Sequence, residues 1–180
     1  MTKIVSAPNE VLSKVADPYV FKKDDKFLPE FLKKMEEALL SASDPKGVGL
    51  AAPQIGTSLS IFIAKPTEKS KITVYINPVI LASTKAKKVK RRVKKLEGCL
   101  SLKDIWGEVL RSPEVTLSYY NEKGKKIEKT FTGFMATIVQ HEVDHLNGIL
   151  FPKRVFEQKG TLYKSSKNEK GEDEFEELSI

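Results

Sequence analysis

The sequence predicts a single domain of the α+β class, in which short antiparallel β-sheets pack around a central helix and an amphipathic helix lies near the N-terminus. Three observations lead to this prediction. Apolar residues recur at helical spacing in two segments, short strand-like runs occupy most of the chain between them, and no repeat or linker divides the sequence. A length of 180 residues with 40% hydrophobic residues is enough for one buried core.

Two helices are predicted. Between Pro29 and Ser43 the apolar residues fall on one face and Glu and Lys on the other, the pattern of a helix packed on a core. The second helix begins after Thr132, a residue type favoured at the N-cap, and stops at Gly148, a residue type favoured just past a helix end. The apolar face expected for this second helix consists of Phe134, Ile138, Val139 and Leu146.

Six short segments rich in β-branched and aromatic residues are predicted as strands: 58–64, 72–76, 89–96, 107–110, 115–120 and 126–131. Asn121–Gly124 is typical of a hairpin turn between the last two. The segment Gly47–Gly56, rich in small residues, is expected to be a turn or an extended loop close to another part of the molecule. The domain is expected to occupy residues 1–163. Residues 164–180 are predicted to be a charged C-terminal tail, either loose or a short appended element.

The composition excludes several classes of protein. No stretch is long and apolar enough to span a membrane, and the first twenty residues have the features of neither a secretory signal nor a transit peptide. We therefore expect a cytoplasmic protein that does not bind a membrane. The single cysteine, Cys99, cannot form an internal disulfide, and so it serves either packing or chemistry.

The net charge of +7 is unevenly distributed. Residues 164–180 contain three lysines and six acidic residues, whereas Lys85–Lys95 contains eight basic residues in eleven. A basic run of this kind is usually a solvated edge or hairpin. The alternative is a surface that contacts phosphates, such as those of ribosomal RNA, and its binding would then weaken with salt.

The segment His141–His145 has the pattern His-Glu-x-x-His on the second predicted helix. A spacing of four residues places both imidazoles on one face, one turn apart, where they can bind one metal ion. Glu142 lies beside the first histidine, so its carboxylate can act as a general base toward a metal-bound water. Two surface histidines on a charged helix would give the same pattern, but the apolar flanking residues indicate a buried helix.

A catalytic metal site of this type needs a third protein ligand. The chain has no third histidine, and the nearest acid downstream, Glu157, lies in a segment with no supporting pattern. Upstream, Cys99 follows Gly98, which lets the backbone approach closely. Cys99 with His141 and His145 is therefore the candidate ligand set, although a free cysteine is more often a small buried apolar residue.

Three segments together resemble the signature motifs of the peptide deformylase family, in the family's order and spacing. They are Gly47–Gln54 (Gly-x-Gly-Leu-Ala-Ala-x-Gln), Glu97–Ser101 (Glu-Gly-Cys-Leu-Ser) and Gln140–Leu146 (Gln-His-Glu-x-Asp-His-Leu). The resemblance covers roughly residues 5–155. It implies a catalytic domain that removes the formyl group from the N-terminal formylmethionine of nascent bacterial polypeptides.

The resemblance also implies a mechanism. One divalent metal ion would be bound by the three candidate ligands; it is ferrous iron in the family, and zinc, nickel or cobalt can replace it. Glu142 would take a proton from the metal-bound water that attacks the formyl carbon, and would return a proton to the leaving amine. The side chain of Gln54 and the backbone N–H of Leu100 would stabilise the oxyanion.

Further residues are candidates for substrate binding and for orienting the ligands. The small residues of the first motif would let an extended peptide add as a strand, although a tight turn that packs a helix is the alternative. Ile138 shares a helix face with His141 and could form a wall of the methionine pocket. The substrate-binding candidates are Gly47, Gly49, Leu50, Gly98 and Ile138. Glu97, Arg111 and Asp144 could orient ligands and loops, or could be surface ion pairs.

The chain departs from the family's pattern at Leu102–Asp104, where the family commonly has a small apolar residue and a proline, so the substrate preference beyond methionine stays open. The basic run Lys85–Lys95 is also unusual, and one hypothesis is that it replaces a ribosome-docking tail. Two alternatives remain: a metallopeptidase that uses the same helix, and a catalytically inactive module that binds nascent chains or RNA. A monomer is expected, although nothing in the sequence determines the oligomeric state.

Overall fold

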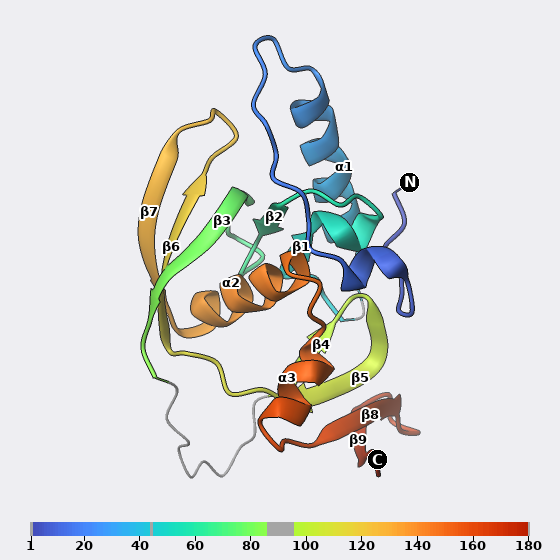
Figure 1. The fold of residues 1–180 in the computed structure, drawn as a ribbon. Helices are drawn as coiled ribbons and strands as arrows, with labels where there is room; N and C mark the ends of the chain where they lie inside the picture. The colour runs from blue at the N-terminus through green and yellow to red at the C-terminus, as the bar shows by residue number, and fades with distance from the viewer. Residues whose placement is uncertain (1, 44, 86–95, 180) are drawn as a thin grey trace.

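The computed structural model describes residues 2–43, 45–85 and 96–179, and it confirms the α+β class with antiparallel sheets (Figure 1). In chain order the elements are the 3₁₀ helix η1 (Glu10–Ser13), α1 (Phe27–Ser41), β1 (Gly49–Ala51), the 3₁₀ helix η2 (Ala52–Ile55), β2 (Ile61–Ala64), β3 (Thr73–Ser83), β4 (Leu96–Cys99), β5 (Leu102–Glu108), β6 (Glu114–Tyr120), β7 (Lys126–Thr132), α2 (Gly133–Leu146), α3 (Phe151–Glu157), β8 (Leu162–Lys167) and β9 (Asp173–Glu177).

The strands form two sheets. One has the order β1-β2-β3-β6-β7 and the other the order β4-β5-β8-β9, and all neighbours are antiparallel. In Figure 1 helix α2 lies at the centre of the molecule, between the five-stranded sheet and the hairpin of β4 and β5. The end of β4 is thereby brought to the helix that carries both histidines.

Strand β2 explains how α1 and α2 are held on opposite faces of one sheet. Its four residues are apolar and fully buried, because successive side chains of a strand alternate between two covered faces. Ile61 and Ile63 belong to the apolar cluster that contains the buried face of α1, whereas Phe62 and Ala64 belong to the cluster that contains the buried face of α2. Helix α2 is therefore packed against a rigid surface.

The helix boundaries are close to those expected. α1 begins and ends two residues before the predicted segment. At the start of α2, Thr132 occupies the N-cap with extended backbone, but its side chain makes no capping hydrogen bond. The helix ends in a left-handed Gly148 (φ +68°), whose N–H donates to the carbonyl of His145, while the N–H of Ile149 donates to that of Asp144. This pair of bonds is the Schellman motif that glycine permits.

One predicted core position in α2 is wrong. Phe134 is 55% exposed, and the buried residues of the helix begin at Ala136. The first turn of α2 is therefore uncovered, a boundary that helical spacing alone does not reveal.

Two of the predicted strands differ clearly in their bounds, and β1, β8 and β9 lie in segments that were not predicted as strands. β3 continues beyond Ile76 to Ser83, because Asn77 (φ +49°) and Pro78 shift its register against β6 instead of ending it. β5 spans Leu102–Glu108, and the predicted strand at 107–110 shares only two residues with it. Within the predicted strand 89–96, residues 89–95 lie outside the described residues and Leu96 begins β4. The basic run, except Lys85, also lies outside them.

Ordered structure continues to the end of the described chain. The short helix α3 follows Leu150, and β8 and β9 form a hairpin that pairs with β5 through Ile105, Trp106 and Gly107. β8 begins at Leu162 and joins the sheet of β4 and β5, so the boundary expected after residue 163 falls inside a strand. Among the described residues, no helix has the length and apolar character needed to cross a membrane.

Candidate metal centre and active site

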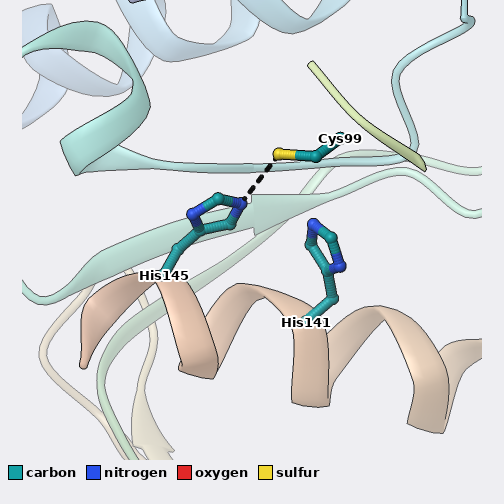
Figure 2. A group of neighbouring side chains, drawn as sticks. All are labelled: Cys99, His141 and His145. Carbon is teal, nitrogen blue, oxygen red and sulfur yellow. Dashed lines mark hydrogen bonds between the residues drawn. The ribbon is translucent and has the colours of Figure 1, made fainter. Parts of the chain in front are cut away.

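Cys99, His141 and His145 meet beside α2 (Figure 2), and their potential ligand atoms all lie within 4.8 Å of one another. Cys99 ends β4 and is 4% exposed, and its Sγ lies 3.2 Å from Nε2 of His145. Both imidazoles project from one face of α2, as the four-residue spacing requires. One thiolate and two imidazoles are a ligand set for a divalent transition metal that leaves a coordination position for water, so the donor chemistry of this cluster fits a catalytic metal ion.

The two imidazoles differ in their surroundings. Nδ1 of His141 lies 3.1 Å from Oε2 of Glu97, which leaves its Nε2 as the nitrogen that can bind a metal. His145 directs Nε2 toward the thiol, and its buried Nδ1 has no hydrogen-bond partner among the described residues. Burial lowers the pKa of His145 well below its usual range, and the neutral imidazole is the form that binds metals.

Gln54, in η2, directs its amide NH₂ group toward this cluster. Its Oε1 accepts a hydrogen bond of 2.9 Å from the N–H of Ala51, which fixes which end of the amide faces inward. Nε2 then lies 3.5 Å from Sγ of Cys99 and 3.3 Å from Oγ of Ser101. The side chain is 2% exposed, so this donor is held in place before any ligand binds.

Glu142 occupies the space that Gly49 leaves open. A Cβ atom at Gly49 would lie 2.3 Å from Oε1 of Glu142, so any larger residue would displace the carboxylate. The buried Oε2 has no hydrogen-bond partner among the described side and main chains. Burial raises the pKa of Glu142 to about 7, although the charges of His141 and Arg111 oppose the rise. A carboxyl group with this pKa can both accept and return a proton near neutral pH.

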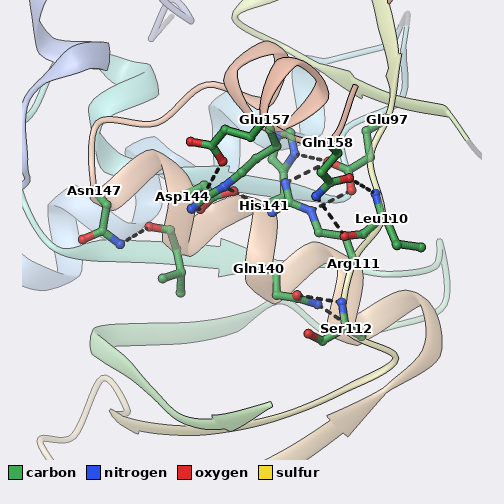
Figure 3. Close-up of polar contacts among 12 residues, drawn as sticks. Glu97, Leu110, Arg111, Ser112, Gln140, His141, Asp144, Asn147, Glu157 and Gln158 are labelled. Atoms are coloured by element: carbon green, nitrogen blue, oxygen red, sulfur yellow. Dashed lines mark hydrogen bonds and ion pairs between the residues drawn. The ribbon is translucent and has the colours of Figure 1, made fainter. Parts of the chain in front are cut away.

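Glu97, Arg111 and Asp144 form a buried polar network behind His141 (Figure 3). Arg111 donates from Nε and Nη2 to the two oxygens of Glu97, at 2.8 and 2.9 Å, and from Nη1 to Asp144 at 2.5 Å. Burial alone would raise the pKa of Glu97, but the hydrogen bonds of His141 and Arg111 outweigh it and lower the value to about 2. Glu97 therefore holds a full negative charge beside His141.

Comparison with known proteins decides the family. The family model for polypeptide deformylase matches residues 1–160, nearly the whole of the chain described above. The chain belongs to the peptide deformylase family. It is accordingly an enzyme of the type that deformylates N-formylmethionyl peptides, and the resemblance carried by the three sequence motifs is confirmed.

Individual relatives agree with this assignment. The peptide deformylase of Pseudothermotoga lettingae is 46% identical over 105 residues, which span 58% of this chain and 57% of that protein. Peptide deformylase 1 of Bacillus cereus is 37% identical over 155 residues, 85% of this chain and 91% of that protein. A class I type b peptide deformylase from Acinetobacter baumannii, solved with bound Met-Ala-Ser, is similar with a TM-score of 0.72 and 33% identity, covering 84% of this chain and 96% of that chain.

Strand β1 of this deformylase lies at an edge of the five-stranded sheet and is hydrogen-bonded only to β2 among the described strands. Its other edge is one along which an extended peptide can add. The side chain of Leu50 is fully buried on the side of α1.

The other substrate-binding candidates have close neighbours of their own. A Cβ at Gly47 would lie 2.7 Å from Cδ1 of Leu39, and one at Gly98 would lie 2.9 Å from the ring of Trp106. Ile138 is 3% exposed and belongs to the apolar cluster of α2. Leu100 follows β4 and its side chain packs with the cluster of α1. Packing thus accounts for part of why these residues are small or apolar.

Sequence reasoning missed Arg154, which contacts both oxygens of Asp144 from α3: Nη2 lies 2.7 Å from Oδ1 and Nε lies 3.1 Å from Oδ2. It also gave no role to Gln140 and Gln158. Glu157, the nearest acidic residue downstream of the second predicted helix, does not join the cluster of Cys99, His141 and His145. Its Oε2 accepts a hydrogen bond of 2.9 Å from Nη1 of Arg154. No local pattern marks Arg154 and Gln158, because α3 is two turns long and follows its own loop.

Proposed function

We propose that this deformylase is a metallohydrolase that removes the formyl group from the N-terminal formylmethionine of newly made polypeptides and releases formate. The observation that carries the proposal is the convergence of Cys99, His141 and His145, whose ligand atoms lie within 4.8 Å of one another. These three residues would hold one divalent metal ion. We expect ferrous iron, and the same thiolate and imidazole ligands also suit zinc, nickel and cobalt.

When bound, the metal ion supplies a Lewis acid and an activated water for attack on the formyl carbon. Glu142 accepts the proton released in that step and returns a proton to the amine that leaves. Its position supports this role, since the carboxylate is buried beside a candidate ligand residue and Oε2 accepts no hydrogen bond from the described part of the chain.

Two donors would stabilise the negative charge that develops on the formyl oxygen. Nε2 of Gln54 faces the cluster because Ala51 holds the other end of the amide. The backbone N–H of Leu100, the residue after Cys99, is the second donor of the proposal. Donors held in place before the reaction lose nothing to reorganisation, and each such group contributes about 10²–10³-fold to the rate.

The formylated peptide would bind in extended form along the open edge of β1. The backbone of Gly47 and Gly49 would pair with it on one side, with Leu50 anchoring the strand, and the backbone at Gly98 would approach it on the other. Ile138 would form part of the wall around the methionine side chain. The position of β1 at a sheet edge supports this arrangement, as does the Met-Ala-Ser bound to the similar enzyme of Acinetobacter baumannii.

The site of action would be the cytoplasm, where a monomeric enzyme meets nascent chains at the ribosome. The basic run Lys85–Lys95 remains the candidate contact with ribosomal RNA. Neutralising its lysines should then slow deformylation of ribosome-bound chains and leave a free formylated peptide unaffected. If the variant deformylated ribosome-bound chains as fast as the unchanged protein does, that contact would be excluded.

The reaction is tested with a matched pair of peptides, formyl-Met-Ala-Ser and Met-Ala-Ser, on enzyme purified without oxygen and loaded with nickel. The proposal predicts formate from the first and no cleavage of either peptide backbone. Cleavage of the unformylated peptide would favour the metallopeptidase alternative. Binding of the formylated peptide without formate release would favour the inactive binding module.

A further inference from the structure

Two glutamine side chains hold the backbone on either side of Arg111 (Figure 3). Oε1 of Gln158 accepts from the N–H of Leu110 at 2.7 Å, and its Nε2 donates to the carbonyl of Leu110 at 3.2 Å. Gln140 makes the same pair of bonds with Ser112, at 3.0 and 2.9 Å. An amide group offers one acceptor and donors, as a neighbouring strand does. Residues 110 and 112 are therefore fixed although they lie between β5 and β6, outside any regular strand.

The side chain of Arg111 is held by a second group of contacts. Its Nη1 donates to Asp144, whose two oxygens also accept from Arg154 at 2.7 and 3.1 Å. Asp144 is 9% exposed and lies between two guanidinium groups, so its orientation is determined from both sides. Arg154 belongs to α3, and Gln158 caps the C-terminal end of the same helix. One short helix thus supports both the backbone and the side chain of Arg111.

Arg111 in turn orients a metal-ligand candidate. Its two parallel bonds fix the plane of the Glu97 carboxylate, and Oε2 of that carboxylate lies 3.1 Å from Nδ1 of His141. A hydrogen bond at Nδ1 sets both the tautomer and the ring orientation of a histidine that binds metal through Nε2. Continuous contacts therefore lead from Arg154 through Asp144, Arg111 and Glu97 to His141.

We propose that Arg154 and Gln158 are positioning residues of the metal centre, which slow metal release by fixing Arg111 and, through Glu97, the imidazole of His141. The inference rests on the metal site of the proposed function but not on the reaction. Metal release is measured without any formylated substrate, so a failure of this inference is distinguishable from a failure of the deformylase mechanism.

The test compares the rate at which nickel-loaded protein loses its metal to an excess of chelator. Arg154→Gln and Gln158→Ala should each release nickel about three- to tenfold faster than the unchanged chain, less than the ~10–100-fold expected for a group that touches the ligand directly. Arg154→Lys keeps the charge but not the two parallel bonds to Asp144. It should therefore release nickel more slowly than Arg154→Gln but faster than the unchanged chain. The matched control is Glu157→Gln, which removes the negative charge of the outward partner of Arg154, 45% exposed, and should leave the rate unchanged.

A double-substituted variant separates positioning from general stability. Glu97→Ala breaks the connection between Arg111 and His141, so adding Arg154→Gln to it should not accelerate nickel release further. Circular dichroism of each metal-free variant verifies that it is folded at the temperature of the assay. If Arg154→Gln does not fold, Gln158→Ala provides the same comparison. Unchanged nickel release in the folded variants would overturn the proposal. It would also be overturned if the double variant released nickel faster than Glu97→Ala by the factor that Arg154→Gln produces alone.

Discussion

At the scale of single residues, the proposed active site depends on the close contact between Gly49 and Glu142. The two residues are far apart in the chain, yet the carboxylate fills the volume that a Cβ at position 49 would need. The absence of a side chain at Gly49 is thus a requirement of the proposed general base as well as of the peptide that we place along β1.

We predict that Gly49→Ala lowers kcat by about 10²-fold, because displacement of a reacting group by about 1 Å has effects of that size. The new methyl group would meet the far end of the Glu142 side chain, which can rotate away, so the free energy of unfolding should change little. Steady-state kinetics on the nickel enzyme measures the first effect and urea unfolding the second.

Gly133→Ala is the control for that change. Among the described residues, none outside the adjoining chain and helix backbone lies within 4 Å of a Cβ at this position, but its φ of +59° makes any side chain strained. The control should therefore lose stability and keep kcat. An unchanged kcat in Gly49→Ala would show that Glu142 does not need its present position.

Replacing Gln54 by leucine should lower kcat by about 10²–10³-fold, since an oxyanion donor is lost while the volume is nearly retained. The same change leaves the N–H of Ala51 without its partner and should cost about 1–3 kcal/mol of stability. Nickel content is expected to stay at the level of the unchanged chain. A variant with full kcat would remove Gln54 from the mechanism.

At the scale of elements, α1 and α2 were predictable because their apolar residues recur every three or four positions over fourteen or more residues. Strand β5 was not predictable in this way, because Lys103 and Asp104 are exposed and interrupt its apolar pattern. Helix α3 has only seven residues and was missed for a related reason. Short elements are specified by what they pack against, which local sequence does not display.

The hairpin of β8 and β9 pairs with β5 and contacts the side chain of Trp106. No local pattern in the tail indicates this contact. Nε1 of Trp106 donates to Oγ of Ser165 at 3.0 Å, and the ring packs edge-on against Phe175 with centroids 5.8 Å apart. We predict that Phe175→Ala destabilises the protein by about 1 kcal/mol, the value of one aromatic pair. Urea unfolding measures this change.

Activity toward the formylated peptide should not respond to Phe175→Ala, because the hairpin does not supply any of the proposed catalytic groups. A loss of kcat larger than twofold would mean that the C-terminal hairpin takes part in the site. In that case the hairpin would have to be counted among the elements that support the site.

At the scale of the whole molecule, the site depends on contacts between segments that are distant in sequence. Cys99 and His145 are separated by 46 residues, and Gln54 precedes Cys99 by 45. The candidate ligand set was predictable because few residue types can bind such a metal and the chain contains one cysteine and two histidines. The support from Arg154 and Gln158 was not, because arginine and glutamine are common on surfaces and only the packing of α3 brings them to Arg111.

The most direct test of the account compares the unchanged chain with Glu142→Ala, both purified without oxygen and loaded with ferrous iron. Metal content and formate release from formyl-Met-Ala-Ser are measured on the same preparations. The account predicts about one metal ion per chain in both proteins, because Glu142 is not a ligand, and formate from the unchanged chain alone. Loss of the metal in Glu142→Ala, or formate release at the unchanged rate, would contradict the assignment of Cys99, His141 and His145 as ligands and Glu142 as the base.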